Sequence, residues 1–277
     1  MPKRSLDWYE GPTIKTSEDW LALEPKERRN FAEQMDVMGP IEALLDRRSV
    51  PLPEAIEKTC PYCLGKGVIK HSPRKTGVFS PSDITGCMRR QYFQLVGFKS
   101  RKAWDLTGNL TMDIGTAIHL LFQKDYLWEL YGPESDDPVS FEEEVKVRIP
   151  EWDLLGSGDG VFTFEKFRFG LEIKSASAKT IEKLGDPEAK YLMQNVCYNR
   201  GLDLPGTLFL YVEKPWPHRT VQIFNGFDPE MWKSVEMRIA AVRKHVEDGT
   251  LPDKTVPDFD CRSCWMSHIC KYGTGDL

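Results

Sequence analysis

Residues 159–174 read DGVFTFEKFRFGLEIK, and this stretch decides the fold that we expect. Apolar and polar residues alternate or cluster in it as they do in strands, and Glu165 and Lys166 interrupt the pattern. We therefore predict two antiparallel strands, over 159–164 and 167–174, joined by a short turn.

The second of these strands carries a pair of charged side chains. Glu172 and Lys174 are two residues apart, so both point to one face of the strand, while Ile173 points into the core. If the first strand brings Asp159 alongside, two carboxylates meet beside one lysine. Mg²⁺ and Mn²⁺ prefer oxygen ligands of this kind.

Such a metal site has a defined chemistry. The metal can acidify its bound water and stabilise charge on a phosphate, and Lys174 can orient the nucleophile or neutralise developing charge. The expected reaction is hydrolysis of a phosphodiester. The alternative is that Glu172 and Lys174 belong to a solvated ladder of charges on an exposed strand.

Outward from these strands, the pattern of apolar residues and capping signals gives the remaining elements. We predict further strands over 140–149, 207–213 and 220–226. The expected helices are one or two from Ser17 to Arg48 interrupted at Gly39-Pro40, one that begins at Ser80 and carries Cys87, and three over Asp113–Tyr131, Asp186–Gly201 and Asp228–Gly249. The expected fold class is α/β, with a central sheet flanked by helices.

The chain divides by composition into three parts. Residues 1–55 are expected to form an N-terminal helical appendage, 56–78 a small basic insert that contains cysteines, and 79–277 the main core. The chain has 277 residues, of which 40% are hydrophobic and 29% charged, so it is long enough for a large core and is not disordered by composition.

Targeting signals are missing from the sequence. No apolar run approaches the roughly 20 residues of a membrane helix, and the start MPKRSLDWYE is too polar for a signal peptide. We therefore expect a cytoplasmic protein with no membrane partner. In a reducing compartment the seven cysteines indicate metal or redox chemistry more than disulfides.

Charge is distributed unevenly along the chain. The formal net charge is −5, but residues 64–103 hold nine Lys or Arg against the single acid Asp83. This segment, which includes Arg89 and Arg90, is either a phosphate-binding face or a solvated surface whose compensating acids lie on neighbouring elements.

Five of the seven cysteines form two closely spaced groups. CRSCWMSHIC at 261–270 has the spacing of three metal ligands, and a fourth ligand must come from elsewhere, because structural zinc and iron–sulfur sites normally take four. CPYC at 60–63 is half of a zinc knuckle that His71 can extend, an unliganded loop, or a redox pair. Two nearby glycines disfavour the helix that a redox pair needs. Cys197 is expected to be a buried thiol.

Two helices carry polar side chains at i, i+4 spacing. His119 follows Gly115, where an imidazole can reach a metal or a phosphate, and Gln194 and Tyr198 present an amide and a phenol on a common face. Ordinary packing also explains each of these side chains.

Taken in order, SPSDITGCMRRQYF, GTAIH, GSGDG, LEIKS, QNVCY and CRSCWMSHIC resemble the iron–sulfur branch of the RecB-like nucleases in the PD-(D/E)xK superfamily. The nuclease subunits of bacterial recombination complexes and the CRISPR-adaptation nucleases belong to this branch. The likeness covers about residues 79–271. It implies a restriction-endonuclease-like mixed sheet, flanked by helices and closed by a cysteine-ligated metal cluster.

The resemblance also implies roles for particular residues. It makes Cys87 the fourth ligand beside Cys261, Cys264 and Cys270, and it favours a [4Fe–4S] cluster over zinc as a structural clasp. It implies that His119, Asp159, Glu172 and the Ile173 carbonyl are metal ligands and that Asp159, Glu172 and Lys174 are catalytic. Gln194 and Tyr198, with Arg89 and Arg90, are expected to position DNA. Gly158 departs from the superfamily pattern, which has proline before the aspartate.

Two functions of different classes follow. The favoured one is a Mg²⁺- or Mn²⁺-dependent DNA exonuclease that acts on single strands or duplex ends in recombination, repair, or phage or CRISPR DNA processing, with a possible recombination or CRISPR-adaptation protein as partner. The alternative is a non-catalytic DNA-binding or scaffold protein that keeps the fold and the cluster. A zinc-stabilised interaction module is a third hypothesis, but it requires His119, Gln194 and Cys87 to coincide by chance.

Overall fold

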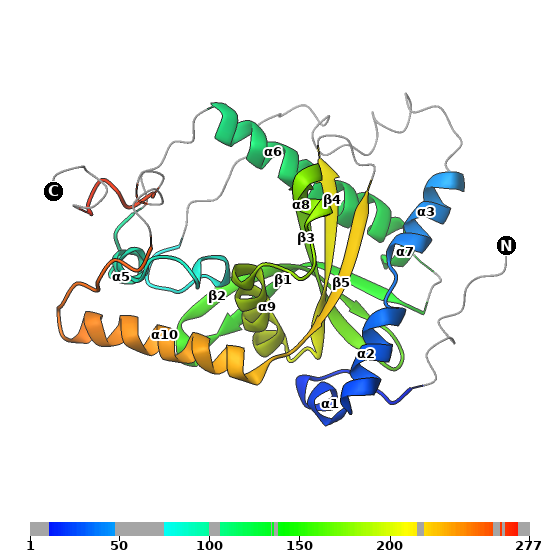
Figure 1. Cartoon of the computed structure of the whole chain (residues 1–277), viewed down its shortest axis with the longest axis horizontal. Helices are drawn as coiled ribbons and strands as arrows, with labels where there is room; N and C mark the ends of the chain where they lie inside the picture. The colour runs from blue at the N-terminus through cyan, green and yellow to red at the C-terminus, as the bar shows by residue number, and fades with distance from the viewer. Residues whose placement is uncertain are drawn as a thin grey trace.

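The computed structural model describes residues 11–47, 75–99, 106–133, 135, 138–214, 219–256, 261 and 264–270. Within these residues the centre of the protein is one five-stranded sheet in the order β1-β2-β3-β4-β5 (Figure 1). The strands are β1 (Ser140–Ile149), β2 (Leu154–Thr163), β3 (Arg168–Ser177), β4 (Gly206–Lys214) and β5 (Thr220–Gly226). Strands β3 and β4 are parallel and the other neighbours are antiparallel. The predicted mixed sheet flanked by helices is confirmed.

Strand bounds follow the apolar pattern closely, with two exceptions. β3 continues to Ser177, three residues past the predicted end at 174. β1 and β5 coincide with the predicted ranges, and β4 is buried along almost its whole length, as expected of a strand covered on both faces. β2 begins at Leu154, five residues before the predicted start at 159. The glycine-rich sequence there has no apolar alternation, but Gly156 and Gly158 pair with Val147 and Val145 of β1.

Helices cover both faces of the sheet. Val161 packs with Leu204, just beyond α9 (Ala189–Leu202), whereas its neighbour Phe162 contacts Tyr131 of α7 (Leu127–Tyr131), so these two helices lie on opposite faces. The long α10 (Pro229–Glu247) packs on the outside of α9 (Figure 1). α7 continues α6 (Leu106–Leu120) through a π-helical turn, η2 (Leu121–Tyr126). The short helices η3 (Pro150–Trp152) and α8 (Ala178–Glu182) complete the connections.

The predicted limits of α9 are wrong at both ends. The helix begins after Glu188 rather than at Asp186, and it continues to Leu202, past Gly201. Gly201 is needed for close packing and not for helix termination, because a Cβ at this position would lie 2.5 Å from Cγ1 of Val147 on β1. By contrast, Asp228 caps α10 as predicted and accepts from two amides of its first turn.

The helix predicted to begin at Ser80 is divided. A 3₁₀ turn, η1 (Pro81–Asp83), comes first, and α5 (Met88–Leu95) begins only after Cys87, which is its N-cap residue. The amide of Gly86 donates to the Asp83 carbonyl, which closes a tight turn between the two pieces. Cys87 therefore lies at a helix start and not inside a helix.

The N-terminal helices share the core of the sheet. α1 (Ser17–Ala22), α2 (Pro25–Gln34) and α3 (Met38–Arg47) replace the one or two helices predicted, and Gly39-Pro40 lies in the first turn of α3 instead of interrupting a helix. Phe31 of α2 is fully buried against Phe167 and Phe224. The predicted appendage thus packs directly onto the sheet, and the domain boundaries at residues 55 and 78 stay a prediction. No helix among the described residues is long and apolar enough to cross a membrane.

Candidate active site

The backbone ladder opens on both sides of Asp159. In β1–β2 the register pairs Glu143 with Gly160 and Val145 with Gly158 but skips Glu144 opposite Asp159. Glu144 has a left-handed backbone with φ of 51°. In β2–β3 the pairing ends at Gly160, one position before Asp159 would face Glu172. Asp159 therefore lies where the Cα pairing of the strands is interrupted. Its carboxylate accepts a hydrogen bond from the backbone of β3 at this point.

The Asp159 carboxylate binds two different elements. Its Oδ2 accepts a hydrogen bond of 2.6 Å from the Ile173 backbone N–H, and its Oδ1 lies 3.3 Å from Nδ1 of His119 on α6. The first contact fixes the carboxylate to β3 in place of a ladder bond. The second brings α6 to the same point, so the side chains of Asp159 and His119 meet as the sequence predicts.

Glu172 is buried beside this pair, with 2% of its surface exposed. Its Oε1 accepts hydrogen bonds from Lys174 Nζ and, at 3.0 Å, from Gln194 Nε2 of α9. Its Oε2 is buried and has no hydrogen-bond partner within the described part of the chain. Burial, together with the charge of Asp159, raises the pKa of Glu172 from 4.5 to about 7.

Lys174 lies on the same side of β3 as Glu172, as the two-residue spacing predicts. Its ammonium contacts Glu172 and lies 4.4 Å from the centre of the Tyr191 ring on α9. Burial lowers its pKa, but Glu172 and Asp159 raise it by more, so the net shift is upward and Lys174 stays protonated. The solvated charge ladder is therefore excluded for Glu172, which is buried.

The imidazole of His119 is also shifted toward its charged form. Burial lowers the pKa of His119, but Asp159 and Glu172 raise it by more. Four residues before His119, α6 approaches β3: a Cβ at Gly115 would lie 3.5 Å from the Ser175 hydroxyl. A Cβ at Gly115 would thus make only ordinary contact with β3, one helical turn before His119.

Gln194 and Tyr198 are joined in this site. The Gln194 amide donates to the Tyr198 hydroxyl at 3.0 Å as well as to Glu172, and both side chains are buried. Burial and the nearby carboxylates raise the pKa of Tyr198 well above its ordinary value, so the phenol stays protonated. The Tyr198 ring lies beside Gly158, where a Cβ would be 3.8 Å from its Cδ2. The predicted role of the pair in positioning DNA stays a prediction.

The donor set fits a hard divalent cation. Two carboxylates and an imidazole lie together, and Oε2 of Glu172, which has no hydrogen-bond partner among the described residues, is the kind of atom that a cation satisfies. The predicted role of the Ile173 carbonyl stays a prediction. In the described part of the chain, however, no group of three or more His, Cys, Asp or Glu side chains is arranged as metal ligands.

The four predicted cluster cysteines lie around one cavity. Cys87, Cys261, Cys264 and Cys270 all line a cavity of about 250 Å³, together with Arg89, Arg90 and Lys254. The loop that carries the last three is held by its own backbone bonds, including Cys264 N–H to the Cys261 carbonyl at 3.1 Å. Burial raises the pKa of Cys264, and the charge of Arg90 opposes this shift. Their ligation of a cluster stays a prediction.

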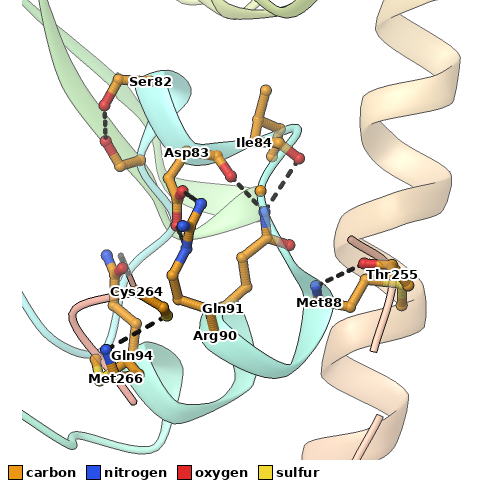
Figure 2. A network of polar contacts seen from close by, with 12 residues as sticks. Ser82, Asp83, Ile84, Met88, Arg90, Gln91, Gln94, Thr255, Cys264 and Met266 are labelled. Atoms are coloured by element: carbon orange, nitrogen blue, oxygen red, sulfur yellow. Dashed lines mark hydrogen bonds and ion pairs between the residues drawn. The ribbon is translucent and has the colours of Figure 1, made fainter. Parts of the chain in front are cut away.

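Arg89 and Arg90 are held inside the protein. Arg89 is buried and donates from Nε to the Pro252 carbonyl at 2.9 Å. Arg90 pairs with Asp83 across the turn, as Figure 2 shows, and its guanidinium lies 4.2 Å from the centre of the Trp265 ring. These contacts join α5 to the C-terminal segment, and they give both arginines a structural role. Their predicted role in DNA positioning stays a prediction.

The remaining candidate ligands fall elsewhere. Cys60, Cys63 and His71 lie outside the described residues, so their zinc site stays a prediction. Cys197 is fully buried and donates to the Met193 carbonyl, as expected of a core thiol. Its burial raises the thiol pKa far above the ordinary value.

Sequence reasoning missed two residues of the site. Tyr191 faces Lys174, and its place three residues before Gln194 on α9 is the signal that identifies it. Gln123 donates to the Asp159 carbonyl at 2.5 Å, and the only sequence signal is its place four residues after His119.

Comparisons with known proteins give only a distant likeness. No protein-family model matches the chain, and no curated protein sequence matches it. Similar solved structures include an alkaline exonuclease, LHK-Exo, from Laribacter hongkongensis, with 15% identity, 63% of this chain and 90% of that chain covered, and a TM-score of 0.44. The same exonuclease in complex with dAMP has 17% identity, with 62% of this chain and 89% of that chain covered, and a TM-score of 0.48. The structure of SSO0001 has 15% identity, with 74% of this chain and 90% of that chain covered, and a TM-score of 0.43. At this level of similarity the function must be argued from the site.

Proposed function

We propose that this protein is a divalent-metal-dependent DNA exonuclease that hydrolyses phosphodiester bonds. One observation carries the proposal: Asp159 and Glu172 lie near each other at the opening of the sheet, beside Lys174 and His119. Within the residues that the structure describes, a buried oxygen of Glu172 has no hydrogen-bond partner. Acidic side chains that share a buried corner with a protonated lysine are suited to a metal and a phosphate. The family resemblance of the sequence supports the same chemistry.

The residues of the site have separate tasks in this proposal. A bound Mg²⁺ or Mn²⁺ would acidify water and stabilise charge on the phosphate. Asp159, Glu172, the Ile173 carbonyl and His119 would hold it, with Asp159 oriented by the Ile173 amide. Lys174 is kept protonated by its neighbours, so it is suited to orient the nucleophile and to neutralise charge on the scissile phosphate. Gln194 fixes Glu172 from α9.

The cysteine cavity is proposed to hold a [4Fe–4S] cluster. The support is that four cysteines from two distant segments line a single cavity, which matches the ligand number of such a cluster. Ligation would join the start of α5 to the C-terminal segment. Anaerobically purified protein should contain about four iron and four sulfide per chain, and Cys87→Ala should lower both. If metal analysis instead finds one zinc per chain and no iron, the cysteines form a four-cysteine zinc site and the cluster proposal fails.

The biological setting is proposed more broadly. Recombination, repair, and phage or CRISPR DNA processing all use nucleases of the kind that the sequence resembles, and a protein partner from one of these systems fits the proposal. A zinc site at Cys60, Cys63 and His71 is a further part of it.

The test is metal-dependent degradation of end-labelled linear DNA beside a closed circle, with Mg²⁺ or Mn²⁺ and anaerobically purified protein. We expect loss of the linear substrate alone. Glu172→Gln keeps the Oε1 acceptor but removes the charge, and it should slow degradation at least about a hundredfold, since outer partners of metal ligands already cost 10–100-fold.

Glu230→Gln, at the exposed start of α10, is the matched control and should degrade DNA like the wild type. Circular dichroism should show both variants folded. If the wild type binds DNA but degrades no substrate with either metal, the nuclease proposal fails and a non-catalytic DNA-binding protein takes its place.

A further inference from the structure

A buried amide outside the predicted site contacts the Asp159 backbone. Gln123 has 1% of its surface exposed, and its Nε2 donates to the Asp159 carbonyl at 2.5 Å. The two residues are 36 positions apart in the chain. A buried glutamine is uncommon, and it is retained where its amide satisfies another buried polar group.

Gln123 donates to the Asp159 carbonyl at the position where the Cα pairing of the sheet is interrupted. The β1–β2 register skips the Glu144–Asp159 position, and the β2–β3 register ends before Asp159. A buried carbonyl without a partner costs free energy comparable to a lost hydrogen bond. Gln123 thus acts where the ladder is interrupted.

The local helix geometry is unusual at the same place. Gln123 lies in the π-helical turn η2, where the Leu127 N–H donates to the Phe122 carbonyl five residues earlier. A π turn inserts one residue, which rotates the following helix by about 100° relative to an α-helix. His119 precedes this turn and Gln123 lies within it, so one helix delivers both the side-chain partner and the backbone partner of Asp159.

We propose that Gln123 is a positioning residue that holds the Asp159 backbone so that its carboxylate faces Glu172 and the metal site. Asp159 is then fixed at three points: its carbonyl by Gln123, its Oδ2 by the Ile173 amide and its Oδ1 by His119. Without Gln123, two of these three contacts remain, and both are made by the carboxylate that has to bind the metal. The inference rests on the proposed function, but metal binding tests it separately from cleavage.

The experiment compares Gln123→Met, which keeps length and burial but cannot donate, with Thr207→Val. Thr207 donates to Asn199 Oδ1 at 2.7 Å and lies at the start of β4, so its variant loses one buried hydrogen bond away from the site. Mn²⁺ affinity is measured by calorimetry, thermal unfolding by circular dichroism, and kcat and KM on linear DNA.

We expect Gln123→Met to weaken Mn²⁺ binding about 10–100-fold and to lower kcat by a similar factor, with KM for DNA nearly unchanged. Thr207→Val should lower the unfolding temperature comparably and leave Mn²⁺ affinity and kcat unchanged. If Gln123→Met does not fold, Gln123→Leu replaces it, because its side chain is also apolar and cannot donate to the carbonyl.

The outcomes separate the two proposals. Wild-type affinity and kcat in a folded Gln123 variant would overturn the positioning role and leave the nuclease proposal intact. If the wild type binds Mn²⁺ but cuts no DNA, the nuclease proposal fails, and the variant's Mn²⁺ affinity alone decides the role of Gln123. A wild type that neither cuts nor binds Mn²⁺ overturns both.

Discussion

Glu172 shows how one residue's surroundings set its chemistry. Its carboxyl is buried, close to the charge of Asp159, and only partly compensated by Lys174. An ionised carboxylate in such surroundings is costly, so the pKa of Glu172 in the metal-free protein lies well above its ordinary value. The same cost makes a divalent cation a favourable partner for this group.

The raised pKa predicts how stability depends on pH in metal-free protein. With a folded-state pKa of about 7 and an unfolded value of 4.5, Glu172 binds more protons in the folded state between these values. The free energy of unfolding should therefore fall as the pH rises from about 4.5 to about 7, by roughly 1 kcal/mol per pH unit.

Urea unfolding in the presence of EDTA, near both ends of this range, measures the effect. Glu172→Gln removes the titrating group and keeps the acceptor for Gln194, so its pH dependence should be smaller by this amount. An identical pH dependence in the two proteins would contradict the assignment to Glu172.

Two glycines of β2 differ in how closely other side chains pack against them, and this difference predicts different costs of substitution. A Cβ at Gly156 would lie 2.8 Å from Cδ of Pro81, whereas one at Gly158 would lie 3.8 Å from the Tyr198 ring, which is ordinary contact. Gly156→Ala should destabilise the protein by about 1–3 kcal/mol, and Gly158→Ala by less than about 1 kcal/mol. Urea unfolding checks both, and equal costs would contradict the role of Pro81.

At the scale of elements, α5 connects the sheet to the C-terminal segment. Arg89 bonds the Pro252 carbonyl, the Met88 amide donates to the Thr255 hydroxyl, and Arg90 pairs with Asp83 (Figure 2). These contacts place Cys87 at the cysteine cavity without any metal. The loop geometry around the cavity is therefore set in part by hydrogen bonds and ion pairs.

This arrangement makes Asp83 important for stability. Asp83 is 3% exposed, so Asp83→Asn leaves the Arg90 guanidinium without its charged partner in a mostly buried place. The expected loss is about 3 kcal/mol. Lys190→Ala, which removes an exposed pair with Glu188, is the control and should cost less than about 1 kcal/mol. Chemical denaturation measures both, and a comparable small loss for Asp83→Asn would mean that the pair adds little.

At the scale of the whole molecule, the N-terminal helices complete the core. Trp20, Phe31 and Ile41 belong to the same buried cluster as Phe169 and Leu208 of the sheet. α2 packs against the edge strand β5, where Phe31 contacts Phe224.

Truncation of this core should be severe. Phe31→Ala removes a fully buried ring that contacts Phe167 and Phe224, and it should cost about 3–5 kcal/mol. Leu21→Ala on α1 changes a side chain that is 38% exposed and should cost less than about 1 kcal/mol. Thermal and urea unfolding compare them. If a chain without residues 1–47 unfolds with the wild-type free energy, these helices are an independent appendage after all.

The sequence by itself determined the parts of this protein that depend on local periodicity. Two-residue alternation predicted the strands and placed Glu172 and Lys174 on one side of β3, and Asp228 predicted the start of α10. The sequence predicted that Asp159 and Glu172 lie together only if the two strands pair in the right register. The site residues on α6 and α9 were found through i, i+4 spacing.

Only the tertiary structure decided what depends on neighbours far along the chain. Gly201 lies inside α9 because Val147 of β1 is too close for a side chain, and Gln123 enters the site because the ladder opens at Asp159. The N-terminal helices join the core because Phe31 fits against β3 and β5 residues that lie more than a hundred positions later. Local sequence carries the propensity of each segment, whereas burial and hydrogen-bond satisfaction are settled only when distant segments pack together.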